Sequence, residues 1–257
     1  MKQATNFILL YLLSLTVIRC GGGESSAFPM DRKYWTPDDY HAVNSELTNL
    51  KYNNKELPSL DNPATAAIVN KIADTTNFTV VATDQQLGIT HRAEFMSGLF
   101  DEYRELTSPY EMLDRQDKYR YPRDLAAIMK FGLGLQLYYL RTGNEKILKE
   151  ADDPKEASIL NLVQQNHNIL IRNYDVYLDE INHEDRFNDA ALITYSEGLR
   201  EYFPRLTSEA PDGNFSDMLV KIGNMLKKAK NPLVIAALQQ IQGILEPKAT
   251  QPARQMK

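Results

Sequence analysis

Residues 122–141 read PRDLAAIMKFGLGLQLYYLR, and this stretch decides the fold. Apolar side chains recur in it every three or four residues, which is the spacing of one face of an α-helix. The face is broad and is formed by Leu125, Ile128, Met129, Gly132, Leu133, Gln136, Leu137 and Leu140. Because so wide a face has to be covered from more than one side, the segment is predicted to be a central helix.

Further helix starts are marked by a capping residue followed by proline. Proline suits the first helical position because its missing N–H would be unpaired there in any case. The pairs are Thr36-Pro37, Asn62-Pro63, Ser108-Pro109, Asp153-Pro154 and Asn231-Pro232. Together with the apolar periodicity they predict helices over residues 37–52, 63–75, 85–106, 109–116, 122–141, 154–182, 187–203, 216–229 and 232–245.

The expected fold is therefore all-α, an irregular bundle of about eight or nine helices in one domain over residues 36–246, with no substantial sheet. The strand-like run at residues 78–83 is predicted to be an extended connector, since a lone strand has no sheet to join. Gly132 and Gly134 indicate close approach of a neighbouring backbone, or else a kink. Residues 247–257 contain two prolines and no apolar stripe, which is typical of a disordered tail.

The first twenty residues have the features of an export signal. Lys2 supplies positive charge, and residues 7–18, FILLYLLSLTVI, carry no formal charge. This apolar run is shorter than the roughly 20 residues that span a bilayer. A short apolar run behind a basic start is typical of a secretory signal peptide, here residues 1–19.

The only cysteine of the chain, Cys20, stands where the apolar run ends. A lone thiol in an exported protein cannot close an internal disulfide. With Val17 three positions before it, Cys20 resembles the lipobox of bacterial lipoproteins, although Arg19 stands where that family usually has Gly, Ala or Ser. The resemblance implies that residues 1–19 are removed, that Cys20 is acylated, and that the body lies outside the cytoplasm, anchored above all to the outer membrane. The alternatives are a secreted protein or an uncleaved anchor.

Residues 20–35 are predicted to be a flexible tether between the lipid and the body. Residues 21–26 read GGGESS, which is the composition of a flexible linker. The single tryptophan, Trp35, lies just before the first expected helix and is predicted to pin the end of the tether to the body.

The net charge argues against one class of partner. The whole chain carries -5, and removal of residues 1–19 takes away Lys2 and Arg19 but no acid, which leaves -7. Binding to a phosphate backbone depends on lysine and arginine contacts, so nucleic acid is not an expected partner. The membrane, through the lipid, and other envelope proteins or polymers are the expected ones.

Two pairs of side chains are candidates for a metal site. Glu180 and His183 have the Glu-x-x-His spacing, and His91 with Glu94 offers the reverse order on another helix. Helical proteins that hold two metal ions use such pairs, pointing inward. The alternative is that these side chains face solvent, because Glu94 lies opposite the apolar face of its helix and His183 lies at a helix end.

His167 is a further candidate because it lies on the apolar stripe of the longest expected helix. That stripe contains Leu160, Val163, His167, Leu170, Tyr174, Tyr177 and Ile181. A buried imidazole needs hydrogen-bond partners for both ring nitrogens. We therefore expect a satisfied core histidine, with a small polar pocket as the alternative.

The chain contains none of the common nucleophile, metalloprotease or phosphate-binding motifs. Its 14 tyrosines are expected to cover the wet edges of a core, with a partner-binding patch as the alternative. The sequence thus favours a lipid-anchored envelope protein that acts as a non-catalytic binding or assembly component without a cofactor. The alternative is a helical enzyme or metal-binding protein that uses His167, or Glu180 with His183.

Overall fold

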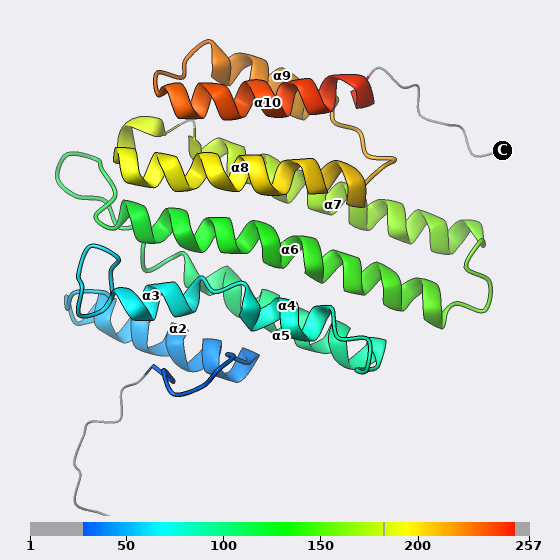
Figure 1. Cartoon of the computed structure of the whole chain (residues 1–257), viewed down its shortest axis with the longest axis horizontal. Helices are drawn as coiled ribbons and strands as arrows, with labels where there is room; N and C mark the ends of the chain where they lie inside the picture. Colours follow the sequence, from blue (N-terminus) through cyan, green and yellow to red (C-terminus); the bar gives the residue numbers. More distant parts are fainter. Residues whose placement is uncertain (1–27, 182, 250–257) are drawn as a thin grey trace, which may run out of the picture.

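The computed structural model describes residues 28–181 and 183–249, and helices dominate it (Figure 1). The elements in chain order are α2 (Pro37–Tyr52), α3 (Ala66–Ile72), α4 (Thr76–Ala82), α5 (Ile89–Leu106), α6 (Pro122–Glu150), α7 (Ala157–Ile181), the 3₁₀ turn η1 (Glu184–Arg186), α8 (Asp189–Glu209), α9 (Ser216–Leu226) and α10 (Pro232–Ala249). These residues form no strand, only an isolated bridge between Leu113 and Tyr119. The all-α prediction is confirmed.

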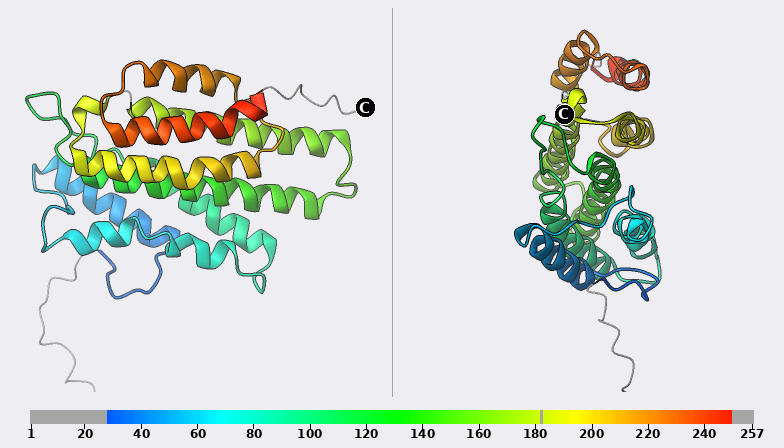
Figure 2. Two further views of the ribbon diagram at one scale, coloured as in Figure 1. Left: turned by 45° about the horizontal axis from the view of Figure 1, so that its top comes forward. Right: turned by 90° about the vertical axis from the view of Figure 1, so that its left-hand side faces the viewer.

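Helix α6 is central, as the width of its apolar face predicted. It packs against α4 and α5 on one side and against α7 and α8 on the other. Helix α10 covers α8, and Lys221 of α9 forms ion pairs with Asp175 and Asp179 of α7. Seen from one end, the helices form a tall stack, with α9 and α10 at one extreme and α2 at the other (Figure 2).

Two tyrosines fill the space beside the glycines of α6. A Cβ at Gly132 would overlap the phenol of Tyr103 from α5, and one at Gly134 would lie 2.8 Å from the hydroxyl of Tyr202 from α8. The glycines therefore do admit a close neighbour, but the neighbour is an aromatic side chain rather than a backbone. The expectation that the tyrosines cover the wet edges of the core is wrong for several of them, since Tyr110, Tyr174, Tyr177, Tyr195 and Tyr202 are buried within it.

Four of the predicted helix starts are confirmed, at Pro37, Pro122, Ser216 and Pro232. At the first of these, Thr36 and Asp39 cap each other's backbone N–H groups in a capping box. Helices α3 and α7 instead begin three residues after Pro63 and Pro154, so those starts were placed too early. Other bounds differ as well: α5 begins at Ile89, α6 runs on to Glu150, α8 to Glu209, and α9 ends at Leu226.

The prediction of a helix over residues 109–116 is wrong. Tyr110 is fully buried there and its hydroxyl donates to the carbonyl of Pro58. The chain then folds back on itself, because the N–H of Arg120 donates to the carbonyl of Met112 at 2.9 Å. The burial of Tyr110 and this fold-back hold the segment in a non-helical conformation, so tertiary packing overrides the local start signal.

The prediction of an extended connector over residues 78–83 is also wrong, since α4 occupies most of this range. The ring of Phe78 packs edge-on against Phe131 and at an angle against Tyr138, both from α6. Burial of Phe78 outweighs the weak strand preference of the β-branched residues around it. Helix α10 continues to Ala249, three residues into the predicted tail, and residues 250–257 lie outside the described part.

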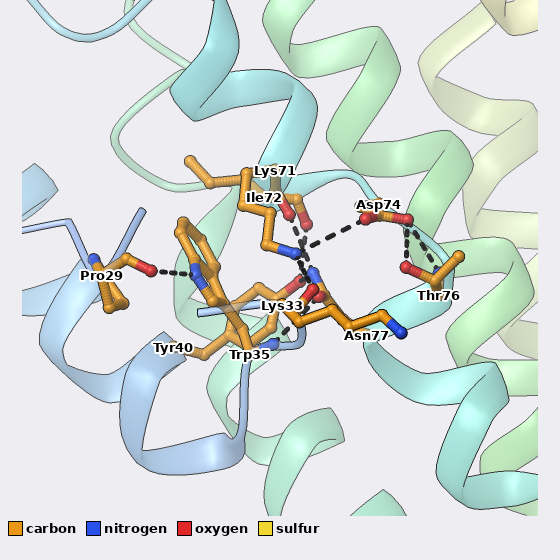
Figure 3. A network of polar contacts seen from close by, with 9 residues as sticks. All are labelled: Pro29, Lys33, Trp35, Tyr40, Lys71, Ile72, Asp74, Thr76 and Asn77. Atoms are coloured by element: carbon orange, nitrogen blue, oxygen red, sulfur yellow. Dashed lines mark hydrogen bonds and ion pairs between the residues drawn. The ribbon is translucent and has the colours of Figure 1, made fainter. Parts of the chain in front are cut away.

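Trp35 is completely buried and holds the entry of the chain against the body (Figure 3). Its indole Nε1–H donates to the carbonyl of Pro29 at 2.9 Å, and its backbone N–H donates to Oδ1 of Asn77 at 3.0 Å. Its ring meets Tyr40 edge to face. The predicted pinning role of Trp35 is confirmed. Phe28 is also buried, so the body begins earlier than the predicted boundary at residue 36.

Asn77 is the centre of this N-terminal clamp, which we define as residues 28–36 together with Tyr40, Lys71, Ile72 and Asn77. Its amide nitrogen donates to the hydroxyl of Tyr40 and to the carbonyl of Lys71, and the Tyr40 hydroxyl donates to the carbonyl of Ile72 at 2.7 Å. Lys71 reaches back through its ammonium group to the carbonyl of Lys33. Every polar group of Asn77 is used, which explains why it is tolerated at zero exposure.

Cys20 and the predicted signal peptide lie outside the described residues. Over residues 28–181 and 183–249, no helix is both long enough and apolar enough to cross a bilayer.

Candidate functional site

A pocket of about 310 Å³ lies where α5 and α7 flank α6. Its walls come from all three helices and from the start of the loop after α5. The lining side chains are Phe100, Tyr103, Arg104, Thr107, Glu111, Met129, Gln136, Asn173, Val176 and Glu180. We call it the α5–α7 pocket. Its volume is at the lower end of the range of small-molecule sites, about 300–1,000 Å³.

The floor of the pocket contains a polar group with no partner. Gln136 projects from α6, and its amide oxygen Oε1 is buried without a hydrogen bond in the described part of the chain. A buried acceptor left unpaired costs about 1–3 kcal/mol. Because this oxygen is closed off from water-sized molecules, only a movement of the side chain would bring it to a ligand in the pocket.

One wall is positioned by the contact between α5 and α6. The ring of Tyr103 rests on Gly132, and burial raises the pKa of its phenol well above the ordinary value of 10.0. The phenol therefore stays neutral at physiological pH. Beside it, Met129 accepts a hydrogen bond from the hydroxyl of Tyr195 through its sulfur, and Phe100 stacks on Tyr139 with ring centroids 4.6 Å apart.

Three charged side chains line the same pocket. Arg104 and Glu111 take no part in the ion pairs found within the described residues. Glu180 accepts a hydrogen bond from the hydroxyl of Tyr119 at 3.2 Å through one carboxylate oxygen. Two carboxylates against one guanidinium leave the pocket with a net negative charge.

The structure brings only one of the four predicted metal-site residues to this pocket. Glu180 lines it, whereas His183 is exposed beyond the end of α7, and His91 and Glu94 are exposed on α5. No group of three or more histidine, cysteine, aspartate or glutamate side chains in the described part is arranged to hold a metal ion. The inward-pointing pairs that a two-metal bundle requires are not formed.

His167 lies on a different face of α7 and does not line the α5–α7 pocket. Its Nδ1 is buried without a partner among the described residues, so the expectation of a fully satisfied core histidine is wrong for this atom. Burial lowers the pKa of the imidazole, while the negative charges of Asp212 and Glu209 act in the opposite direction. The ring is only partly buried.

A larger cavity of about 590 Å³ lies between the start of α8 and the connection from α9 to α10. Much of its polar lining is satisfied within the protein. The Glu184 carboxylate accepts the backbone N–H groups of Lys230 and Asn231, and Lys118 donates to the carbonyl of Asp185 at 2.6 Å. The smaller α5–α7 pocket is the better candidate, because Arg104 and Glu111 in its lining take no part in the ion pairs of the described residues.

Sequence reasoning missed most of this site. The available signal was Gln136, an amide inside an otherwise apolar stripe, where a polar side chain requires an explanation. Comparison of the chain with models of protein families, with curated proteins and with solved structures finds no match.

Proposed function

We propose that the protein is a lipid-anchored component of a bacterial cell envelope, with a helical body that binds a ligand or partner and performs no catalysis. The observation that carries the binding role is the α5–α7 pocket itself, whose lining combines the charged Arg104, Glu111 and Glu180 with apolar side chains. The rim of this pocket contains charged side chains and the exposed apolar side chain of Val176, 59% accessible.

The anchoring role is supported by the sequence before the body and by the N-terminal clamp. Cys20 stands eight positions before Phe28, so a lipid on Cys20 would lie at most about 29 Å from Phe28 along an extended chain. The clamp joins the entry of the chain to α3 and α4 through buried hydrogen bonds. A body held in this way is suited to carry an anchor at its amino-terminal side.

Metabolic labelling with a palmitate analogue tests the anchor. The wild-type protein incorporates the label and remains in the membrane fraction after a high-salt wash. Cys20→Ser incorporates none and appears in the soluble fraction of the envelope. Labelling of both proteins, or of neither, refutes the lipid anchor.

Site-specific photocrosslinking in cells tests the binding role. A photoreactive residue replaces Val176 at the pocket, and the matched control replaces Val220, which is 67% exposed on α9 and outside the pocket lining. Adducts at position 176 that are absent at position 220 support a binding site. Equal adduct yields at the two positions contradict it.

No contact among the described residues supports the alternative of a metal-binding protein or an enzyme. Glu180 and His183 belong to no group of three or more possible metal ligands in the described part of the chain. His167 lies on a face of α7 that does not line the α5–α7 pocket.

A further inference from the structure

We propose that Asn214, in the connection between α8 and α9, is the acceptor of an N-linked oligosaccharide. The inference goes beyond the proposed binding role and rests on the proposed location outside the cytoplasm, because such sugars are attached to exported chains. The donor is an oligosaccharide joined through a diphosphate to a polyprenyl lipid, and a membrane-bound transferase supplies the catalysis.

Two segments of the chain have the Asn-x-Ser/Thr pattern that these transferases use. They are Asn77-Phe78-Thr79 and Asn214-Phe215-Ser216. Bacterial transferases of this kind also favour an acidic residue two positions before the asparagine. Asp212 occupies that position before Asn214, whereas Thr75 occupies it before Asn77. Of the two segments, the second is therefore the better acceptor.

The fold makes the same selection. Asn214 is exposed, and its side-chain oxygen accepts the backbone N–H of Ser216 at 3.0 Å. That is the one hydrogen bond of its side chain within the described residues, so the amide nitrogen that would take the sugar is free. Asn77 is completely enclosed, and its nitrogen already donates to the Tyr40 hydroxyl and the Lys71 carbonyl. An oligosaccharide on Asn77 would break the N-terminal clamp, whereas one on Asn214 would extend into solvent.

The surroundings of Asn214 leave room for a large polar group. The connection projects from the end of α8 (Figure 1), and Asp212 and Ser216 are exposed on either side of the asparagine. Helix α9 lies at the opposite extreme of the stack from α2 (Figure 2). The oligosaccharide would therefore stand apart from the end of the body that carries the proposed anchor.

The sugar has to be transferred before this part of the chain folds. Phe215, between the asparagine and the serine, is completely buried, and the transferase needs all three residues in its own site. The amide nitrogen bonds to C1 of the first sugar, the bond from C1 to the diphosphate oxygen breaks, and the polyprenyl diphosphate leaves with the electron pair. The nitrogen gives up one of its two protons in the same reaction. Folding then buries Phe215 and leaves the sugar outside.

Mass spectrometry of the protein from the membranes of its own cells tests the proposal. Trypsin cleaves after lysine and arginine, which places Asn214 in the peptide of residues 206–221 and Asn77 in the peptide of residues 72–92. We expect most copies of peptide 206–221 to carry an oligosaccharide on Asn214 and peptide 72–92 to carry none. Recovery of peptide 206–221 only in bare form overturns the proposal, and so does an oligosaccharide on Asn77.

Substitutions in the acceptor segment test how it is recognised. Ser216→Ala removes the hydroxyl of the pattern and should abolish the modification, whereas Ser216→Thr keeps the hydroxyl and should retain it. Asn214→Gln should also lose the oligosaccharide and migrate faster than wild type on a denaturing gel. Asn224→Gln, at an exposed position on α9 outside the pattern, should migrate as wild type does. An oligosaccharide in Ser216→Ala, or wild-type migration of Asn214→Gln, contradicts the proposal.

The proposal can fail separately from the proposed anchor. A palmitate-labelled protein with a bare peptide 206–221 shows that Asn214 is not an acceptor, and the envelope location stands. A protein that carries neither label nor oligosaccharide refutes both.

Discussion

Replacing Gly132 by alanine should destabilise the protein, although alanine is the better helix former. In a helix interior the change from glycine to alanine is worth about 1 kcal/mol. Against this, the new Cβ would overlap the phenol of Tyr103, which has to retreat by about 1.5 Å to reach van der Waals distance. Overpacking of this kind costs about 1–3 kcal/mol.

Gly143 provides the matched control because it lies on the same helix, and a Cβ there meets no other atom within 4 Å. Gly143→Ala should therefore show the helix gain alone. The difference between the two variants is the overpacking cost, about 2 kcal/mol, and a body of this size changes its melting temperature by roughly 2–4 °C per kcal/mol. Thermal unfolding followed by circular dichroism should place Gly132→Ala roughly 4–8 °C below Gly143→Ala.

The same two substitutions in a Tyr103→Leu background test whether the Tyr103 ring causes the loss of stability. In Tyr103→Leu, which lacks the hydroxyl and the far edge of the ring, Gly132→Ala should become as favourable as Gly143→Ala. Equal melting temperatures of the two alanine variants in the wild-type background would refute the reasoning.

Glu145→Gln should cost about 2–4 kcal/mol in denaturant unfolding, because Arg92 is only 2% exposed and loses its bidentate charged partner. Glu150→Gln, an exposed control on the same helix, should cost less than 1 kcal/mol. The hydrogen bond from Arg92 lowers the pKa of Glu145 below its ordinary value of 4.5. The stability that this pair contributes is therefore complete above pH 4.5 and is lost as the pH falls through the lower pKa of the folded state. Wild type should lose more stability on acidification than Glu145→Gln, and parallel pH profiles of the two proteins would contradict this. Asn77→Leu should cost about 2–4 kcal/mol, since it leaves several buried partners in the N-terminal clamp unpaired. Amide exchange at Trp35 should accelerate in Asn77→Leu, and unchanged protection there would refute the role of Asn77.

The helical class could be predicted because its signals are local. A stripe with helical spacing and a capping residue before proline at Thr36 or Asn231 act within one or two turns. The same signal misplaced other starts. The side chains of Asn62 and Asp153 accept backbone N–H groups two residues ahead, which forms a turn whether or not the helix begins there. Where the helix starts after such a turn depends on contacts that lie far away in the sequence.

The candidate pocket could not be predicted for the same reason. Its walls depend on the distance between α5 and α7, and these helices meet through α6 rather than through each other. The contact of the Tyr103 ring with Gly132 positions α5 against α6 on one side of the pocket. Nothing in the sequence around either residue indicates that the two are in contact. The Glu-x-x-His spacing paired Glu180, which lines the α5–α7 pocket, with His183, which the fold places on the surface.

Because Trp35 is buried in the N-terminal clamp, its fluorescence reports on the state of that clamp. Trp35 is the single tryptophan of 257 residues and is completely enclosed, so fluorescence excited at wavelengths that tyrosine does not absorb comes from one indole in the clamp. Any event that loosens the amino-terminal segment from α3 and α4 would admit water to that indole and move the emission to longer wavelength. Insertion into vesicles or strain on the amino terminus can therefore be followed in the unlabelled protein, without a dye and without a mutation.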